Sequence, residues 1–69
     1  MNMLPEWLYG YLMELDKKTL LDIMEEALDT MQAYNGRSPT YCIVSAIPNA
    51  KVEETDRGYR YLLPKLDNN

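Results

Sequence analysis

The chain has 69 residues, of which 46% are apolar, and it carries one Cys, no His and a net charge of −4. The apolar content is too high for a disordered chain, and the length allows one small domain, residues 1–69. A single Cys excludes a disulfide within the chain, and without His a zinc site would depend almost entirely on carboxylates, which bind that metal poorly.

The first predicted element is a helix over residues 5–15. Pro5 suits the first position of a helix, because its missing N–H group has no partner there. Apolar residues then recur at helical spacing, namely Trp7, Leu8, Tyr11, Leu12 and Leu15. Gly10 lies inside this pattern and either weakens the helix or marks the close approach of another helix.

A second helix is predicted over residues 17–34, with Asp16 as its N-cap and Asn35-Gly36 as its stop. Its apolar stripe, which we expect to be buried, comprises Leu20, Ile23, Met24, Ala27, Leu28, Met31 and Tyr34. The connection around Asp16 is very short. The two helices, within residues 4–36, should therefore form a helical hairpin or meet at a sharp angle.

Residues 38–47 are compatible with either a short helix or a strand. Ser38-Pro39 looks like an N-cap followed by Pro at the first helical position, and Pro48 closes the segment, which favours a helix. However, the run is short and rich in residue types that prefer strands, namely Thr40, Tyr41, Ile43, Val44 and Ile47.

Residues 51–63 are predicted to form a β-hairpin. Asp56-Arg57-Gly58 has the composition of a turn, with Gly58 in the left-handed conformation. The period of two places Tyr59, Tyr61 and Leu63 on one face. We therefore expect an α+β fold in which this hairpin packs on the second helix, with residues 65–69 as a frayed tail.

No catalytic, cofactor-binding or metal-binding residue emerges from the sequence, and we expect no enzyme activity. Without His, Cys42 lacks the usual base that would activate it, and its apolar surroundings favour a buried structural thiol. The acid pairs Glu25-Glu26 and Glu53-Glu54 are adjacent in sequence, so their carboxylates point in different directions. The three Gly are isolated and form no phosphate-binding loop.

The order of a helix, a short third element and a hairpin resembles that of a winged-helix DNA-binding domain. In this alternative the hairpin is the wing, Arg57 and Arg60 contact phosphates, and Arg37 lies near a helix start. The charge argues against it, because residues 6–29 hold seven acids and two bases. Residues 40–47 also lack the Arg, Lys, Asn or Gln side chains that read base edges.

Protein binding is the function that the sequence favours. Tyr, Trp, Met and Arg are enriched at protein interfaces, and the candidate interface residues are Trp7, Tyr9, Met13, Tyr59, Tyr61, Arg57 and Arg60. We expect a small acidic module that modulates or inhibits another protein. Because small domains without disulfides or metals are often stabilised by association, a homodimer is expected.

The sequence also predicts a cytoplasmic location without membrane association. It shows no basic segment followed by an apolar run at its start, and no apolar stretch approaches the ~20 residues that a spanning helix needs. A lone thiol is compatible with a reducing compartment.

Overall fold

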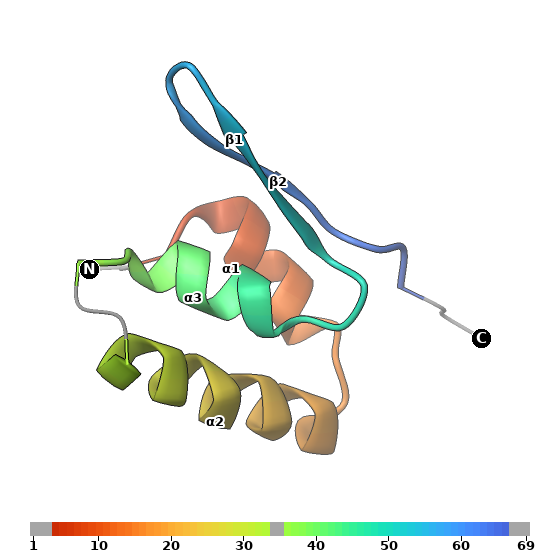
Figure 1. Ribbon diagram of the computed structural model, residues 1–69. Coiled ribbons are helices and arrows are strands. Elements are labelled where there is room, and N and C mark those ends of the chain that lie inside the picture. Colours follow the sequence, from red (N-terminus) through yellow and green to blue (C-terminus); the bar gives the residue numbers. More distant parts are fainter. Residues whose placement is uncertain (1–3, 34–35, 67–69) are drawn as a thin grey trace.

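The computed structural model describes residues 4–33 and 36–66, which form three helices followed by an antiparallel hairpin (Figure 1). The elements are α1 (Glu6–Met13), α2 (Lys17–Ala33), α3 (Pro39–Ala46), β1 (Lys51–Thr55) and β2 (Gly58–Leu62). The predicted α+β class is confirmed. Residues 34–35 and 67–69, which include the end of the predicted second helix and most of the predicted frayed tail, lie outside the described residues.

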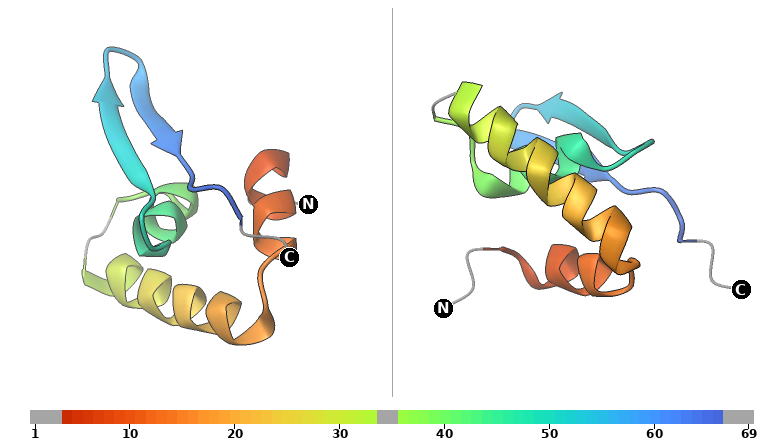
Figure 2. Two further views of the ribbon diagram at one scale, coloured as in Figure 1. Left: turned by 90° about the vertical axis from the view of Figure 1, so that its right-hand side faces the viewer. Right: turned by 90° about the horizontal axis from the view of Figure 1, so that it is seen from below.

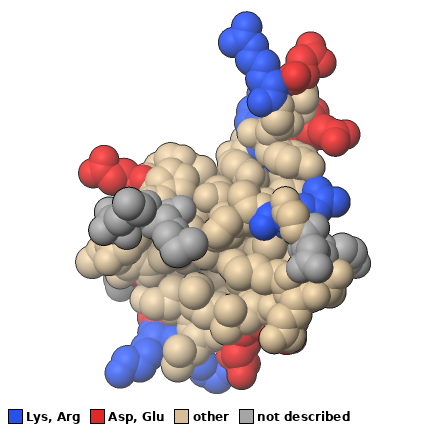
Figure 3. Space-filling model, turned by 90° about the vertical axis from the view of Figure 1, so that its left-hand side faces the viewer, with Lys and Arg blue, Asp and Glu red and all other residues tan. Residues whose placement is uncertain are grey.

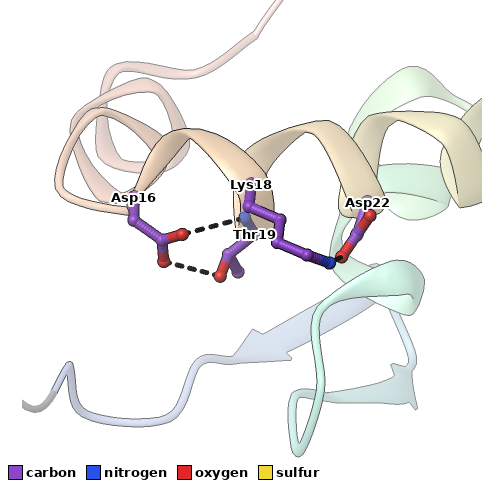
Figure 4. Close-up of polar contacts among 4 residues, drawn as sticks. All are labelled: Asp16, Lys18, Thr19 and Asp22. Carbon is purple, nitrogen blue, oxygen red and sulfur yellow. Dashed lines mark hydrogen bonds and ion pairs between the residues drawn. The ribbon is translucent and has the colours of Figure 1, made fainter.

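The predicted N-cap of the second helix, Asp16, is confirmed, whereas Pro5, expected at the first helical position, is the residue before it. Pro5 is the N-cap of α1, and its carbonyl accepts the N–H groups of Leu8 and Tyr9. Before α2, Asp16 accepts the Thr19 backbone N–H at 3.2 Å and the Thr19 hydroxyl at 2.6 Å (Figure 4). These hydrogen bonds, the hydroxyl's first, lower the pKa of Asp16 from its usual 3.8, because they favour the ionised carboxylate.

The ambiguous segment is a helix, α3. The Ser38 hydroxyl oxygen accepts the Tyr41 N–H at 3.1 Å, and Pro39 occupies the first turn. The start signal therefore prevails over the strand preference of the residues that follow. Burial explains this result, because the helix places Cys42, Ile43 and Val44 in the core despite their low helical propensity.

One apolar core joins the three helices. Its buried members are Leu8, Leu12, Ile23, Ala27, Cys42, Ile43, Val44 and Ile47. Figures 1 and 2 show that α3 lies on α2, whereas α1 meets α2 at a steep angle after the short connection. Of the two arrangements expected for the first two helices, the chain adopts the crossing rather than the side-by-side hairpin.

The β-hairpin pairs Lys51 with Leu62 and Thr55 with Gly58, and its tip projects beyond the helices (Figure 1). Gly58 has a φ of 131°, a backbone conformation that L side chains rarely adopt. We expected the hairpin to pack on the second helix, but it packs on α1 and α3, and α3 lies between it and α2. Val44 of α3 is fully buried, and α3 is the element that contacts both α2 and β1.

One further expectation, for Leu28, is wrong, and one of the two alternatives for Gly10 is excluded. Leu28, expected in the buried stripe, is 56% exposed, because α2 contacts its neighbours along the side that carries Ile23 and Ala27. Gly10 marks no close helix approach, since a Cβ built at this position meets nothing within 4 Å.

Within residues 4–33 and 36–66, none of the helices combines the length and apolar composition that crossing a bilayer requires.

Candidate protein-interaction surface

Four aromatic side chains from three different elements form a continuous row. The ring of Trp7 on α1 lies 5.8 Å from that of Tyr61 on β2, measured between centroids. Tyr61 lies 6.5 Å from Tyr59 on the same strand, and Tyr59 lies 5.0 Å from Tyr41 on α3. We call Trp7, Tyr61, Tyr59 and Tyr41 the aromatic row.

Local structure explains why these residues meet. Side chains two positions apart on a strand point to the same face, so Tyr59 and Tyr61 both lie on the hairpin face that contacts the helices. Tyr61 pairs across the hairpin with Val52, which packs against the core and holds β1 on the helices. The hairpin thereby bridges α1 at one end of the row and α3 at the other.

Arg37 extends the row at its α3 end. Its guanidinium carbon lies 4.7 Å from the centroid of the Tyr41 ring, and its Nη1 donates to the Tyr59 hydroxyl at 2.9 Å. A recess here is lined by Gly36, Arg37, Ser38, Tyr41 and Tyr59. A guanidinium has five N–H donors, so Arg37 can hold the two rings together and still donate to a partner.

The row is partly open to solvent. Trp7 is 47% exposed and Tyr59 is 41% exposed, while Tyr41 and Tyr61 are half-buried. Half-exposed aromatic rings fixed by their neighbours lose little conformational entropy on binding, and Trp, Tyr and Arg are the side chains that most often dominate binding energy. The row and Arg37 therefore have the composition and rigidity of an interface.

A groove continues from the Trp7 end of the row, between α1 and the segment after β2. Its walls include Trp7, Gly10, Tyr11, Leu63 and Pro64. The Tyr11 hydroxyl donates to the Pro64 carbonyl at 3.0 Å and fixes one wall to the other, and burial raises the pKa of Tyr11 above its usual 10.0. Since Gly10 has no side chain, this part of the groove stays open.

Of the seven predicted interface residues, the structure brings together Trp7, Tyr59 and Tyr61. Tyr9 and Met13 lie four residues apart on the flank of α1 opposite to Trp7, and both are exposed. Arg57 lies in the hairpin turn. Arg60 is on the other hairpin face, where its side chain pairs with Glu53 through an Nε–Oε1 hydrogen bond of 3.0 Å. Thus Tyr9, Met13, Arg57 and Arg60 are not part of the row.

Tyr41 and Arg37 complete the surface, although neither was predicted from the sequence to lie at a protein interface. Tyr41 belongs to the segment that is compatible with either a helix or a strand, and Arg37 entered only the winged-helix alternative, as a residue near a helix start. The Ser38-Pro39 helix start could have placed both residues together, because it puts Tyr41 in the first turn of a helix and close to Arg37.

In the view of Figure 3, charged side chains gather on the projecting hairpin and along the lower edge over α2. Between them the surface is mainly tan, with an acidic side chain at its left margin and basic side chains toward its right. In the described part of the chain, no group of three or more Cys, Asp or Glu side chains is arranged to hold a metal ion. The thiol of Cys42 is buried.

Comparisons of the chain with protein-family models, with curated proteins and with solved structures each found no match.

Proposed function

We propose that this chain is a non-catalytic protein-binding module that modulates or inhibits a partner protein by docking it on the aromatic row. The observation that carries the proposal is the fixed, half-exposed line of Trp7, Tyr61, Tyr59 and Tyr41 with Arg37 beside it. Burial of aromatic rings supplies most of the affinity of many interfaces, and Arg adds directional hydrogen bonds. The cytosolic location remains part of the proposal.

The matched exposures of neighbouring residues allow a controlled test. Trp7 is 47% and Tyr9 is 49% exposed on opposite flanks of α1, and Tyr59 and Leu62 are both 41% exposed on opposite hairpin faces. Five tagged proteins are compared, namely wild type, Trp7→Ser, Tyr59→Ser, Tyr9→Ser and Leu62→Ser. Circular dichroism first shows that each is folded, and each is then used to capture partners from nuclease-treated lysate of the native host.

The proposal predicts a stoichiometric protein that wild type, Tyr9→Ser and Leu62→Ser retain and that Trp7→Ser and Tyr59→Ser lose. Equal retention by all five forms, or loss on the Leu62→Ser change alone, would place the interface elsewhere. Loss on the Tyr9→Ser change alone would place it on the flank of α1 that also holds the candidate dimer contacts. Absence of any protein that wild type retains contradicts the proposal as well.

A homodimer remains part of the proposal, with Tyr9 and Met13 as its candidate contacts. Met13, the last residue of α1, is 71% exposed, and Met is enriched at protein interfaces. Replacement by Asp should yield a folded monomer in light scattering if this flank is the dimer contact. An unchanged dimer removes the flank from consideration, and a monomeric wild type ends the dimer hypothesis.

The second candidate function is a winged-helix DNA-binding regulator, and the helical state of α3 is the observation that keeps it open. The element order is the one that this hypothesis requires, with Arg57 in the turn of the projecting hairpin. However, Arg60 is paired with Glu53, and Arg37 with Tyr59, so both would exchange existing partners for phosphate. The exposed residue of α3, Ser45, is too short for most base contacts.

A gel-shift experiment distinguishes the two functions. Electrostatic attraction to DNA is strongest at low salt, so the DNA hypothesis requires wild type to shift a duplex there. It further requires that Arg57→Glu combined with Arg60→Glu abolish the shift while circular dichroism stays unchanged. No shift at low salt rejects the DNA hypothesis.

A further inference from the structure

The outer face of α2 carries two apolar side chains that the fold does not use. Leu21 is 59% and Leu28 is 56% exposed, and seven residues of helix place them about 10 Å apart along one face. Ile23 and Ala27, which are buried, point to the other side of the same helix. Met24, between the two leucines, packs partly against the core. The result is an apolar seam with the heptad spacing typical of helix–helix contacts.

A shallow recess lies beside the first of these leucines. It is lined by Lys17, Lys18, Leu21, Asp22 and Glu25. Lys18 is held along the helix surface by its ion pair with Asp22, in which Nζ and Oδ2 are 3.2 Å apart (Figure 4). The aliphatic parts of the lysine side chains can therefore line the recess with carbon while their charges stay in water.

The charges around the seam decide which occupant fits. The helix holds four acids, Asp22, Glu25, Glu26 and Asp29, against two bases, and one of these bases is already paired. A second copy of the same face would bring two acidic helices together, because a two-fold contact joins identical patches. A basic partner helix would instead gain electrostatic attraction to these acids.

We propose that the outer face of α2 docks a basic amphipathic helix of a partner protein, with apolar residues at heptad spacing that cover Leu21 and Leu28 and with Lys or Arg side chains that meet Glu25 and Asp29. This surface is separate from the aromatic row, because α3 lies between α2 and the hairpin (Figures 1 and 2). The two surfaces together would let one chain join two partners.

A pair of synthetic peptides tests this proposal without knowledge of the natural partner. One fluorescent helical peptide has Leu at the heptad core positions and Lys elsewhere, and its twin carries Glu in place of Lys. Binding to the full chain is measured by fluorescence anisotropy at physiological ionic strength. The Lys peptide should bind wild type, and the Glu peptide should not.

Three variants separate the contributions of apolar burial, of the acids of α2 and of the overall charge to peptide binding. Leu21→Ser combined with Leu28→Ser should bind the Lys peptide roughly tenfold more weakly, because apolar burial is lost. Glu25→Lys combined with Asp29→Lys should lose the Lys peptide and bind its Glu twin. The control, Glu54→Lys, changes an exposed acid of the hairpin and should leave binding unchanged. All of the changed residues are exposed, and circular dichroism verifies the fold.

Some outcomes would overturn the proposal. Undiminished affinity in the leucine variant would mean that the seam takes no part and that only charge attracts the peptide. An equal loss in Glu54→Lys would show that the attraction belongs to the whole molecule rather than to α2. Failure of the Lys peptide to bind wild type rejects this surface while leaving the aromatic row untouched, since the two faces are tested by different residues.

Discussion

The indole of Trp7 packs against the ring of Tyr61, with 5.8 Å between the ring centroids, and so joins the first helix to the last strand. Aromatic pairs in such tilted arrangements contribute about 0.5–1.5 kcal/mol beyond the burial of their area. A double-mutant cycle with Trp7→Leu and Tyr61→Leu should therefore show a coupling energy of that size when unfolding in urea is followed by circular dichroism.

The matched cycle uses Tyr9→Leu with Tyr61→Leu. Tyr9 lies on the opposite flank of α1, so these two changes should be additive. Strict additivity in the Trp7 cycle, or equal coupling in both cycles, would contradict the packing of the row.

Gly10 can be replaced by Ala with a gain in stability. It lies inside α1, it has no atoms within 4 Å of the place where a Cβ would stand, and Ala has the higher helical propensity. Gly10→Ala should raise the free energy of unfolding by up to about 1 kcal/mol in urea denaturation. Gly36→Ala is the control, because its φ of 93° strains an L residue and should lower stability. A loss of stability in Gly10→Ala would contradict the open space around Gly10.

Leu28→Asp and Ala27→Asp should have opposite outcomes, although the two residues are neighbours. Ala27 is fully buried, so a carboxylate there loses its hydration without a partner and should unfold the protein. Leu28 is more than half exposed, so its variant should remain folded. Thermal unfolding followed by circular dichroism checks both. Unfolding of Leu28→Asp would instead support the buried stripe that the sequence alone suggested.

Asp16 should make stability depend on pH in the acid range. Its folded-state pKa is lowered, so it stabilises the fold above the unfolded value near 3.8 and loses this effect as pH falls through the folded value. Asp16→Ala should lower the melting temperature by several degrees at pH 7, and the difference from wild type should shrink well below pH 4. Asp16→Asn keeps a capping side chain and should lose less. Calorimetry at the two pH values measures this, and a difference that is independent of pH would contradict the role of the carboxylate.

The elements themselves could be predicted because their signals are local. Asp16, Ser38-Pro39 and Gly58 set their boundaries through hydrogen bonds and backbone angles that involve few residues. Which helix the hairpin covers is set by tertiary packing, and the sequence pattern does not contain that information. Leu28 illustrates the same limit, since apolar periodicity marks a stripe without showing how wide a part of it the neighbouring helix covers.

Three of the seven predicted interface residues meet in the structure. Local sequence patterns could predict only part of this arrangement, because the rest depends on contacts between residues far apart in the chain. Alternation along β2 predicted that Tyr59 and Tyr61 share a face. Contact of these rings with Trp7 and Tyr41 depends on the packing of the hairpin across α1 and α3. The same alternation places Arg60, between the two tyrosines, on the other face, whereas its pairing with Glu53 follows from the register of the hairpin.

The aromatic row is the centre of this account, and photo-cross-linking in the native host tests it most directly. A photoreactive phenylalanine analogue replaces Tyr59 in one variant and Leu62 in another, two positions of equal exposure on opposite hairpin faces. If the row is the interface, position 59 should give a defined cross-linked protein and position 62 should give none. Cross-links of equal yield from both positions, or no protein cross-link from position 59, would contradict it.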